Sequence, residues 1–223
     1  MGTPKVVRNS LVNVTFLCAI TPVFEPCLPA FKLLTQSLLE QTFQDFIHIA
    51  ISNGKSASIQ EWTSSLKNSR FIYDELAAES TPTLSTLLCN LGKRRNHCLK
   101  KYDADRFVFL DADLKITDNA YFQKLWLAHN DAAVLLTKVK NGPTTLPKFP
   151  IERGRIDIAN YSFNREIAKK VDYPTDIDFR YGIANDFRFY ERLGRYSWKV
   201  LPDICAIKDG NKCYTRLSER GGV

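Results

Sequence analysis

One stretch constrains the fold of this chain more than any other: residues 106–113, Arg-Phe-Val-Phe-Leu-Asp-Ala-Asp. Residues 107–110 have the length and the apolar, β-branched and aromatic composition of a strand buried on both faces, as in the middle of a parallel sheet. Side chains alternate along a strand, so Asp111 and Asp113 are expected to project to the same side. Ligands of such sheets bind beyond the carboxyl ends of the strands, and the pair therefore predicts a ligand site there.

Two carboxylates this close together favour a bound cation. Hard oxygen ligands suit Mg²⁺ or Mn²⁺, which commonly keep open positions for phosphate oxygens. The alternative for Asp-x-Asp alone is a solvated acidic turn after a strand. The rest of the sequence has to decide between the two interpretations.

The composition is that of one soluble globular domain, with 223 residues, 44% of them hydrophobic and 25% charged. Lys and Arg number 31 against 24 acidic residues, and the net charge of +7 favours an anionic partner such as a nucleotide. The basic residues are dispersed and do not alternate with aromatic ones. This pattern argues against a nucleic-acid-binding surface.

The six cysteines show neither zinc spacing nor a Cys-x-x-Cys pair. Most lie in or beside apolar runs, which favours a reduced, cytoplasmic protein. The apolar run at 11–20 is short and lacks a cleavage pattern, so no signal peptide is expected. No run approaches the roughly 18 to 20 apolar residues that a transmembrane segment needs.

Strands and helices are predicted to alternate over the first part of the chain. The strands are expected at 12–20, 46–52, 70–73, 107–110 and 132–137, and the helices at 30–41, 59–66, 83–102 and 119–128. Thr21-Pro22 is expected to end the first strand, and Gly92 to break the third helix. The alternation predicts an α/β fold, a three-layer sandwich with a mostly parallel central sheet.

The pattern changes after Lys140. Residues 141–155 are rich in Pro, Gly and Thr without a period, which predicts a long mobile loop. Strands are then expected at 156–161, 198–201 and 205–208, and helices at 164–171 and 186–193. No second core is apparent, so residues 1–223 are interpreted as one domain, with halves at about 12–137 and 156–209.

Several separated motifs resemble one family. They are Thr21-Pro22-Val23-Phe24, the helix end Ser37-Leu38-Leu39-Glu40-Gln41-Thr42-Phe43, Gly92 with Arg95-Asn96, Phe109-Leu110-Asp111-Ala112-Asp113, and Asn185-Asp186 before Glu191-Arg192-Leu193. In this order and spacing they resemble the family 2 glycosyltransferases of the GT-A fold over roughly residues 12–209. The resemblance implies a Rossmann-like nucleotide-binding half and a nucleoside diphosphate sugar as donor.

The resemblance also implies roles for individual residues. Asp111 and Asp113 would bind Mn²⁺ or Mg²⁺, with Asp111 also near the ribose, and Asp209 falls where many relatives have a third metal or diphosphate ligand. The nucleoside pocket would contain Thr21, Pro22, Phe24, Asn53 and Arg95. Asn53 replaces the carboxylate that commonly reads the base, and would bond to a uracil edge instead.

Asp186 is the predicted general base. A helix N-terminus stabilises its ionised form, and removal of the acceptor proton on the face opposite the diphosphate inverts the anomeric configuration. The family's Glu before this Asp is replaced by Asn185. Asp157 and Asn160 are placed at the start of the acceptor pocket by position alone. A plain N-cap aspartate is the alternative interpretation of Asp186.

The sequence thus predicts a metal-dependent, inverting glycosyltransferase that moves a sugar, with UDP as the expected nucleotide, to a hydroxyl of a glycan, protein or lipid acceptor. A sugar nucleotidyltransferase would need a Gly-rich loop after the first strand, and residues 21–29 contain no glycine. A non-catalytic nucleotide-sugar-binding module stays an alternative, because Asn53 and Asn185 depart from the family pattern.

Overall fold

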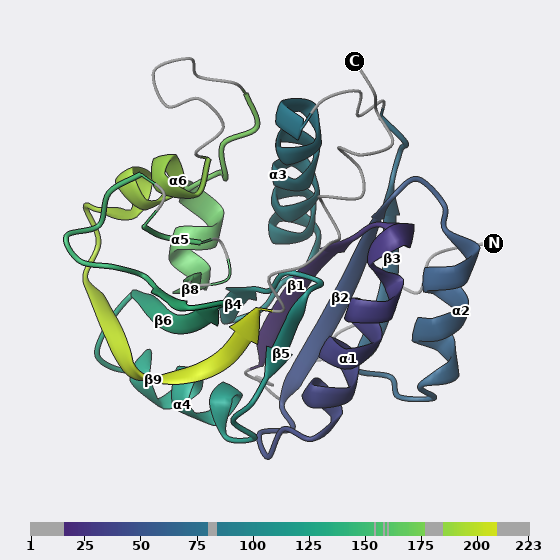
Figure 1. The fold of residues 1–223 in the computed structure, drawn as a ribbon, viewed down its shortest axis with the longest axis horizontal. Helices are drawn as coiled ribbons and strands as arrows, with labels where there is room; N and C mark the ends of the chain where they lie inside the picture. Colours follow the sequence, from purple (N-terminus) through teal and green to yellow (C-terminus); the bar gives the residue numbers. More distant parts are fainter. Residues whose placement is uncertain are drawn as a thin grey trace.

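The computed structural model describes residues 16–79, 84–153, 155–157, 159, 161–176 and 185–208 (Figure 1). Its elements in chain order are β1 (Leu17–Val23), the 3-10 helix η1 (Glu25–Cys27), α1 (Leu28–Leu39), β2 (Phe46–Asn53), α2 (Ala57–Ser65), β3 (Phe71–Leu76), α3 (Leu84–Lys101), β4 (Arg106–Phe109), β5 (Leu114–Ile116), α4 (Tyr121–Ala128), β6 (Val134–Asn141), β7 (Thr144–Leu146), β8 (Tyr161–Asn164), α5 (Arg165–Lys170), α6 (Asn185–Leu193) and β9 (Trp198–Lys208).

All the strands belong to one sheet of order β3-β2-β1-β4-β8-β6-β9-β5, with β7 paired to β6 outside this path. The four strands β3, β2, β1 and β4 are parallel, whereas β8 joins β4 antiparallel. The chain moves outward from β1 to β2 and β3, then returns to the other side of β1 for β4. The carboxyl ends of β1 and β4 therefore lie at a topological switch point, where open α/β sheets bind their ligands.

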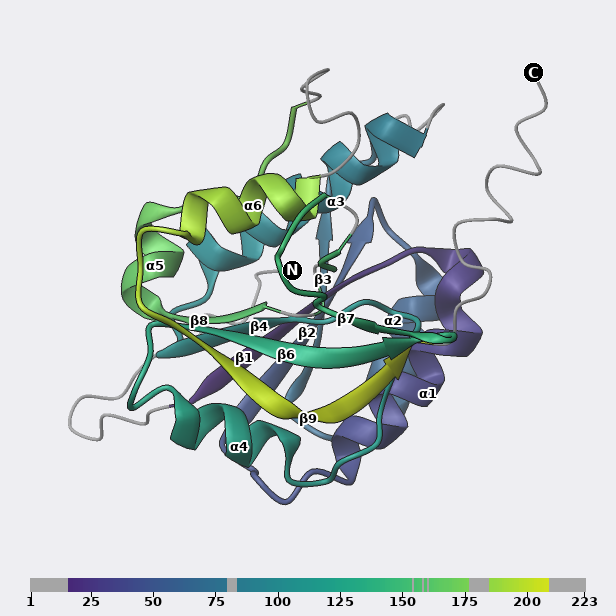
Figure 2. The same cartoon turned by 60° about the vertical axis from the view of Figure 1, so that its left-hand side comes forward.

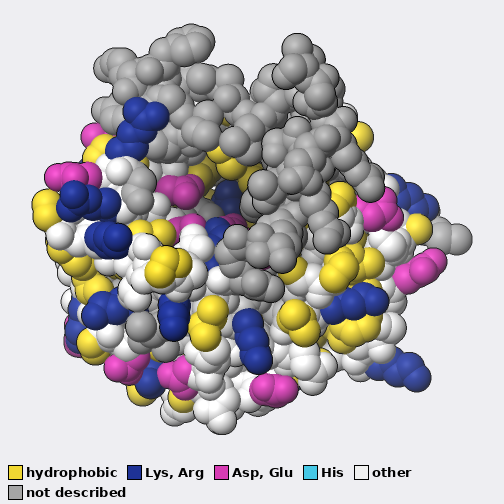
Figure 3. Space-filling model, viewed as in Figure 1, with side chains coloured by type: hydrophobic (Ala, Val, Ile, Leu, Met, Phe, Trp, Pro, Cys, Tyr) yellow, Lys and Arg dark blue, Asp and Glu magenta, His cyan; other side chains and the backbone are white. Residues whose placement is uncertain are grey.

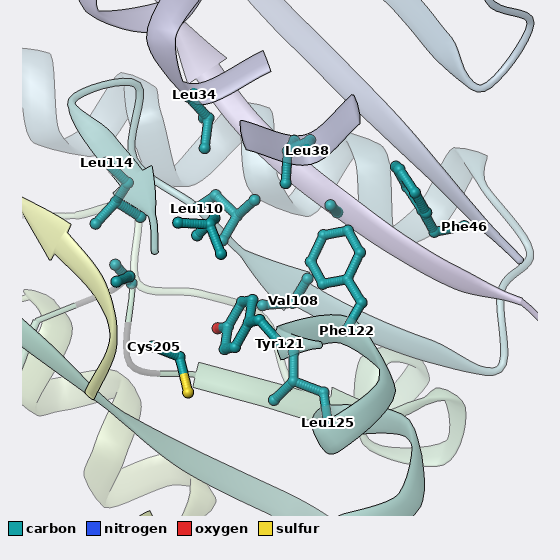
Figure 4. Packing of buried hydrophobic residues seen from close by; sticks show 14 of the residues in the cluster. Leu34, Leu38, Phe46, Val108, Leu110, Leu114, Tyr121, Phe122, Leu125 and Cys205 are labelled. Atoms are coloured by element: carbon teal, nitrogen blue, oxygen red, sulfur yellow. The ribbon is translucent and has the colours of Figure 1, made fainter. Parts of the chain in front are cut away.

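Helices cover both faces of the sheet (Figures 1 and 2). Helices α1, α2 and α4 pack on one face of the sheet and form the first hydrophobic core with it, and α3, α5 and α6 form the second core on the other face. Strand β4 serves both cores, because Val108 faces the first, together with Leu110 just beyond its end (Figure 4), whereas Phe107 and Phe109 face the second. The predicted three-layer α/β fold is confirmed, with its parallel strands concentrated in the N-terminal half.

The prediction that Thr21-Pro22 ends the first strand is wrong. Within the described residues β1 runs from Leu17 through Val23, paired to β2 along its whole length. The pairing of β1 with β4 stops at Ile20, whose carbonyl accepts a bond from Leu110 N at 3.0 Å. Pro22 lies on that same side of β1, two residues later, so its missing N–H breaks no ladder bond.

Helix α3 is continuous, contrary to the predicted break at Gly92. A Cβ at this position would lie 2.6 Å from Pro174 O and 2.7 Å from Tyr173 Cδ1. Asn96, one turn later, binds the same segment, with 2.9 Å from its Nδ2 to Tyr173 O and 2.8 Å from Tyr173 N to its Oδ1. Gly92 is therefore needed for the close approach of residues 173–174, while the hydrogen bonds of the helix continue through it.

We expect Gly92→Ala to lower the free energy of unfolding by about 1 to 3 kcal/mol, because the new methyl group overpacks against a backbone carbonyl. Thermal melting followed by circular dichroism should then show a Tm lower by about 2 to 4 °C per kcal/mol. Gly194→Ala is the matched control, since the nearest atoms to its Cβ would be Glu191 O at 3.4 Å and Tyr190 O at 3.7 Å. Equal Tm values for the two variants would contradict the role given to Gly92.

Three further predictions in the second half are corrected. The start of the expected loop 141–155 forms a hairpin, in which β7 pairs with β6 around Gly142 at φ 57°. The strand expected at 156–161 is instead β8, because Ile156 is buried against the second core without pairing in the sheet. The two short strands expected near the end are one strand, β9, which keeps its pairing to β6 across register shifts.

Two findings bear on the cellular setting. The cysteines in the described residues form no disulfide with one another; they are Cys18, Cys27, Cys89, Cys98 and Cys205. None of the helices in the described part of the chain combines the length and the apolar character that crossing a membrane requires. The cytoplasmic location stays a prediction.

Candidate functional site

The candidate site lies at the carboxyl end of β4. Asp111 and Asp113 follow this strand in a turn closed by a 3.1 Å bond from Leu114 N to Asp111 O. Both side chains are buried, at 6% exposure each. Figure 3, viewed from the same side as Figure 1, shows acidic and basic side chains close together in a hollow of the surface.

Asp111 is held between two cations. Its Oδ1 accepts a bond from Arg95 Nη2 at 3.0 Å, and its Oδ2 accepts one from Lys208 Nζ at 2.6 Å. Burial by itself would raise the pKa of Asp111, but the charges of Lys208 and Arg95 outweigh it and hold the pKa below its usual range. Asp111 is therefore ionised throughout the neutral range.

Lys208 gathers three carboxylates, those of Asp111, Asp113 and Asp157, which we call the carboxylate cluster. Its Nζ lies 2.9 Å from Asp157 Oδ2 and 4.0 Å from Asp113 Oδ1, and its side chain is 12% exposed. Burial opposes its charge, yet the three carboxylates raise the pKa of Lys208 well above its ordinary value. The ammonium is therefore a permanent positive charge inside the cluster.

Asp113 is the least satisfied member of the cluster. Its Oδ1 is buried and has no hydrogen-bond partner among the described residues. Burial, together with repulsion from Asp111 and Asp157, outweighs the attraction of Lys208 and raises the pKa of Asp113 to about 7. Near neutral pH this carboxyl group is thus divided between its ionised and protonated forms.

We expect Asp113→Asn to stabilise the protein at pH 8 by about 1 to 2 kcal/mol, with a smaller gain at pH 5. A carboxyl whose pKa is raised on folding adds stability at low pH, and this stability is lost as the pH rises through the folded pKa. Asparagine removes that loss. Tm measured at both pH values checks the result, with the exposed Asp203→Asn as control, and a lower Tm for Asp113→Asn at pH 8 would contradict it.

Asp186 lies in the first turn of α6 and is half-buried. Its Oδ1 accepts a bond from the Tyr173 hydroxyl at 2.5 Å, and its backbone carbonyl accepts one from the Tyr161 hydroxyl at 2.8 Å. Burial, and then repulsion from Asp157, raise the pKa of Asp186 to about 6. The Tyr173 hydroxyl fixes the orientation of the carboxylate, and a pKa near the working pH suits a general base.

The basic residues Lys93, Arg94 and Arg95 separate into three settings. Lys93 forms a surface ion pair with Glu79. Arg94 is fully buried and donates to Ser52 O, Asn90 O and the Asn53 side chain. Only Arg95 faces Asp111, with its guanidinium 5.2 Å from the Tyr173 ring centre and 5.6 Å from that of Phe109. Of the three, Arg95 is thus the one at the candidate site.

The residues predicted for the nucleoside pocket lie beside this site in structural contacts of their own. The Asn53 amide makes two 3.0 Å bonds to the backbone of Glu79, and the Thr21 hydroxyl lies 2.9 Å from His48 Nε2. Pro22 is buried inside β1, and Phe24 packs on the first core. Their contacts with a nucleoside stay predictions.

Two residues of the site, Lys208 and Tyr173, were not predicted from the sequence. The available signal for Lys208 was its place at the end of a predicted strand, directly before Asp209. No pattern in the sequence marks Tyr173. Asp157, predicted to face the acceptor, instead binds Lys208, so its acceptor role stays a prediction. Asp209 and Asn160 lie outside the described residues.

The described residues do not fit a divalent ion in this arrangement. Both oxygens of Asp111 are engaged by Arg95 and Lys208, and the Lys208 ammonium lies inside the carboxylate cluster, where the sequence predicts the ion. Within the described ranges no group of three or more His, Cys, Asp or Glu side chains is placed to hold a metal. The predicted Mn²⁺ or Mg²⁺ therefore stays a prediction.

Comparison with known proteins identifies relatives in structure alone. No protein-family model matches the sequence, and no curated protein matches it. The chain is similar to TarS 1-349 from S. aureus in complex with UDP, with a TM-score of 0.67 and 17% identity over 86% of this chain and 60% of that one. It is also similar to the mannosyltransferase PcManGT from Pyrobaculum calidifontis in complex with GDP-Man and Mn²⁺, with a TM-score of 0.64 and 14% identity over 88% of this chain and 57% of that one.

This chain thus spans about three fifths of the length of either structure. At these identities the likeness establishes the fold, and it confirms the predicted GT-A type of α/β sandwich.

Proposed function

We propose that this chain is an inverting glycosyltransferase that moves a sugar from a nucleoside diphosphate, with UDP as the expected nucleotide, to a hydroxyl of a glycan, protein or lipid. One observation carries the proposal: Asp186 is oriented by Tyr173 beside a site that holds the two cations Arg95 and Lys208. The structural likeness to TarS bound to UDP, and to a mannosyltransferase bound to GDP-Man, supports it.

At the donor end the reaction needs positive charge, because the diphosphate leaves with the electron pair of the glycosidic bond. Arg95 and Lys208 are placed to meet this charge, and Asp111 holds both in position. Fixed charges in a largely buried site act without the reorganisation that water would require. The donor diphosphate is therefore expected to lie over Arg95 and Lys208.

At the acceptor end the reaction needs a base. Asp186 removes the proton of the acceptor hydroxyl, whose oxygen attacks the anomeric carbon while the bond to the diphosphate oxygen breaks on the opposite face. The anomeric configuration is inverted in this single displacement. A carboxylate with a pKa of about 6 is ionised at neutral pH and still basic enough to accept the proton.

Calorimetric titration with UDP, GDP and dTDP, in EDTA and in Mn²⁺, tests the donor site. We expect UDP to bind, and release of UDP from UDP-sugars then reports turnover. The absence of binding by all three nucleotides under both conditions would overturn the proposal. Binding without turnover of any UDP-sugar would favour the non-catalytic module, and pyrophosphate release from UTP and a sugar phosphate would favour the nucleotidyltransferase.

A further inference from the structure

We propose that Lys208 binds the donor diphosphate directly and takes the place of a divalent ion, so that donor binding needs no metal. The inference rests on the proposed function and names the group that neutralises the leaving diphosphate. It differs from the metal-dependent mechanism that the sequence predicts.

The position of Lys208 is fixed by the backbone on both sides. It is the last residue of β9, and its register partners are Leu114 in β5 and Asn141 in β6. Leu114 directly follows Asp113, so the pairing of β5 with β9 places the lysine beside the acidic turn. A side chain anchored between two strands is held in the site before any ligand arrives.

The hydrogen bonds of the ammonium leave capacity for a ligand. Of its three N–H donors, one is directed to Asp111 Oδ2 at 2.6 Å and one to Asp157 Oδ2 at 2.9 Å. Asp113 Oδ1, at 4.0 Å, is too distant to accept the third. The side chain is 12% exposed, and we assign its third N–H to a phosphate oxygen of the donor.

The ion pairs of Lys208 also compete with a divalent ion for the same carboxylate oxygens. Lys208 and Arg95 together balance Asp111 and Asp157. Within the described part of the chain, Asp113 Oδ1 is the one oxygen of the cluster that is buried and accepts no hydrogen bond. A divalent ion that uses the oxygens of Asp111 and Asp157 would have to displace the ammonium from two short ion pairs. Removing the lysine charge should therefore weaken diphosphate binding and, at the same time, open the carboxylate cluster to metal.

The test is calorimetric titration of UDP into the wild-type chain, Lys208→Met and Lys199→Met, each in EDTA and in Mn²⁺. Lys199 lies on the same strand and forms only a surface pair with Asp131, so its variant is the matched control. We expect equal UDP affinity with and without metal for the wild type and the control. In EDTA we expect Lys208→Met to bind UDP about 10- to 100-fold more weakly, the loss of one charged hydrogen bond.

A second readout needs no nucleotide. Electron paramagnetic resonance of Mn²⁺ should show free ion with the wild type and bound ion with Lys208→Met. If the wild type binds UDP only in the presence of Mn²⁺, the role of Lys208 is overturned and the proposed function stands. This comparison uses the wild-type chain alone and does not depend on the folding of any variant. The absence of nucleotide binding under every condition overturns both.

Discussion

Under the proposed function, Asp186→Asn is expected to slow the release of UDP from a UDP-sugar by about 10²- to 10⁴-fold, the usual contribution of a general base. Asparagine keeps the size of the side chain and can still accept the bond from the Tyr173 hydroxyl, but it cannot take a proton. The affinity for UDP, measured by calorimetry, should stay unchanged, because the cations proposed to bind the diphosphate are Arg95 and Lys208, which bind Asp111 and not Asp186.

The pH profile gives an independent check on the same residue. Since the pKa of Asp186 is raised to about 6, kcat/KM of the wild type should fall as the pH is lowered through this value. Asp176→Asn is the matched control, because Asp176 is an exposed carboxylate that binds Arg188 of α6, the helix that carries Asp186. An Asp186→Asn variant that retains wild-type turnover would identify this residue as a plain helix cap.

Asp111→Ala is expected to have the largest effect on stability, with a loss of about 3 to 5 kcal/mol in the free energy of unfolding. The substitution takes away the carboxylate between two buried cations, Arg95 and Lys208. Urea denaturation measures the loss, and calorimetry should show that UDP binding is lost as well, because both cations lose the group that positions them.

The pH range of this effect follows from the lowered pKa of Asp111. A carboxyl whose pKa falls on folding adds stability above its unfolded pKa, and that stability disappears as the pH falls through the folded value. The difference in the free energy of unfolding between the wild type and Asp111→Ala should therefore have its full size from pH 5 to 8 and become smaller in stronger acid. Asp131→Ala, which breaks only a surface pair, should change stability by less than about 1 kcal/mol. A similar small change for Asp111→Ala would show that the two cations do not depend on it.

The N-terminal half of the fold was predictable because its signals are local. The strand periods of residues 46–52 and 107–110 and the helical spacing of residues 30–41 are strong, and each element buries a face that its own sequence defines. The strands that were missed, β5 and β7, have three residues each, too few to show a period. Strand β9 was divided in two because Pro202 interrupts its pattern, although its pairing to β6 continues on either side.

The candidate site was predictable to the extent that it follows one strand. Asp111 and Asp113 are marked by the abrupt end of an apolar run, and Arg95 by a motif with its neighbours. Lys208 was not predictable in this way, because it lies 97 residues from Asp111 and reaches it only through the register of β9 against β5. A charge partner set by long-range strand pairing leaves no spacing in the sequence.

Two adjacent residues of α3 reach the two ends of the proposed reaction. Arg95 contacts Asp111 in the proposed donor site, and Asn96 binds the backbone of Tyr173, whose hydroxyl donates to Asp186. Helix α3 therefore sets the distance between the proposed leaving-group site and the proposed base, and neither substrate is needed to fix it. In a glycosyltransferase with this arrangement, changes in the outer loops can alter the acceptor while the distance between the base and the leaving diphosphate stays the same.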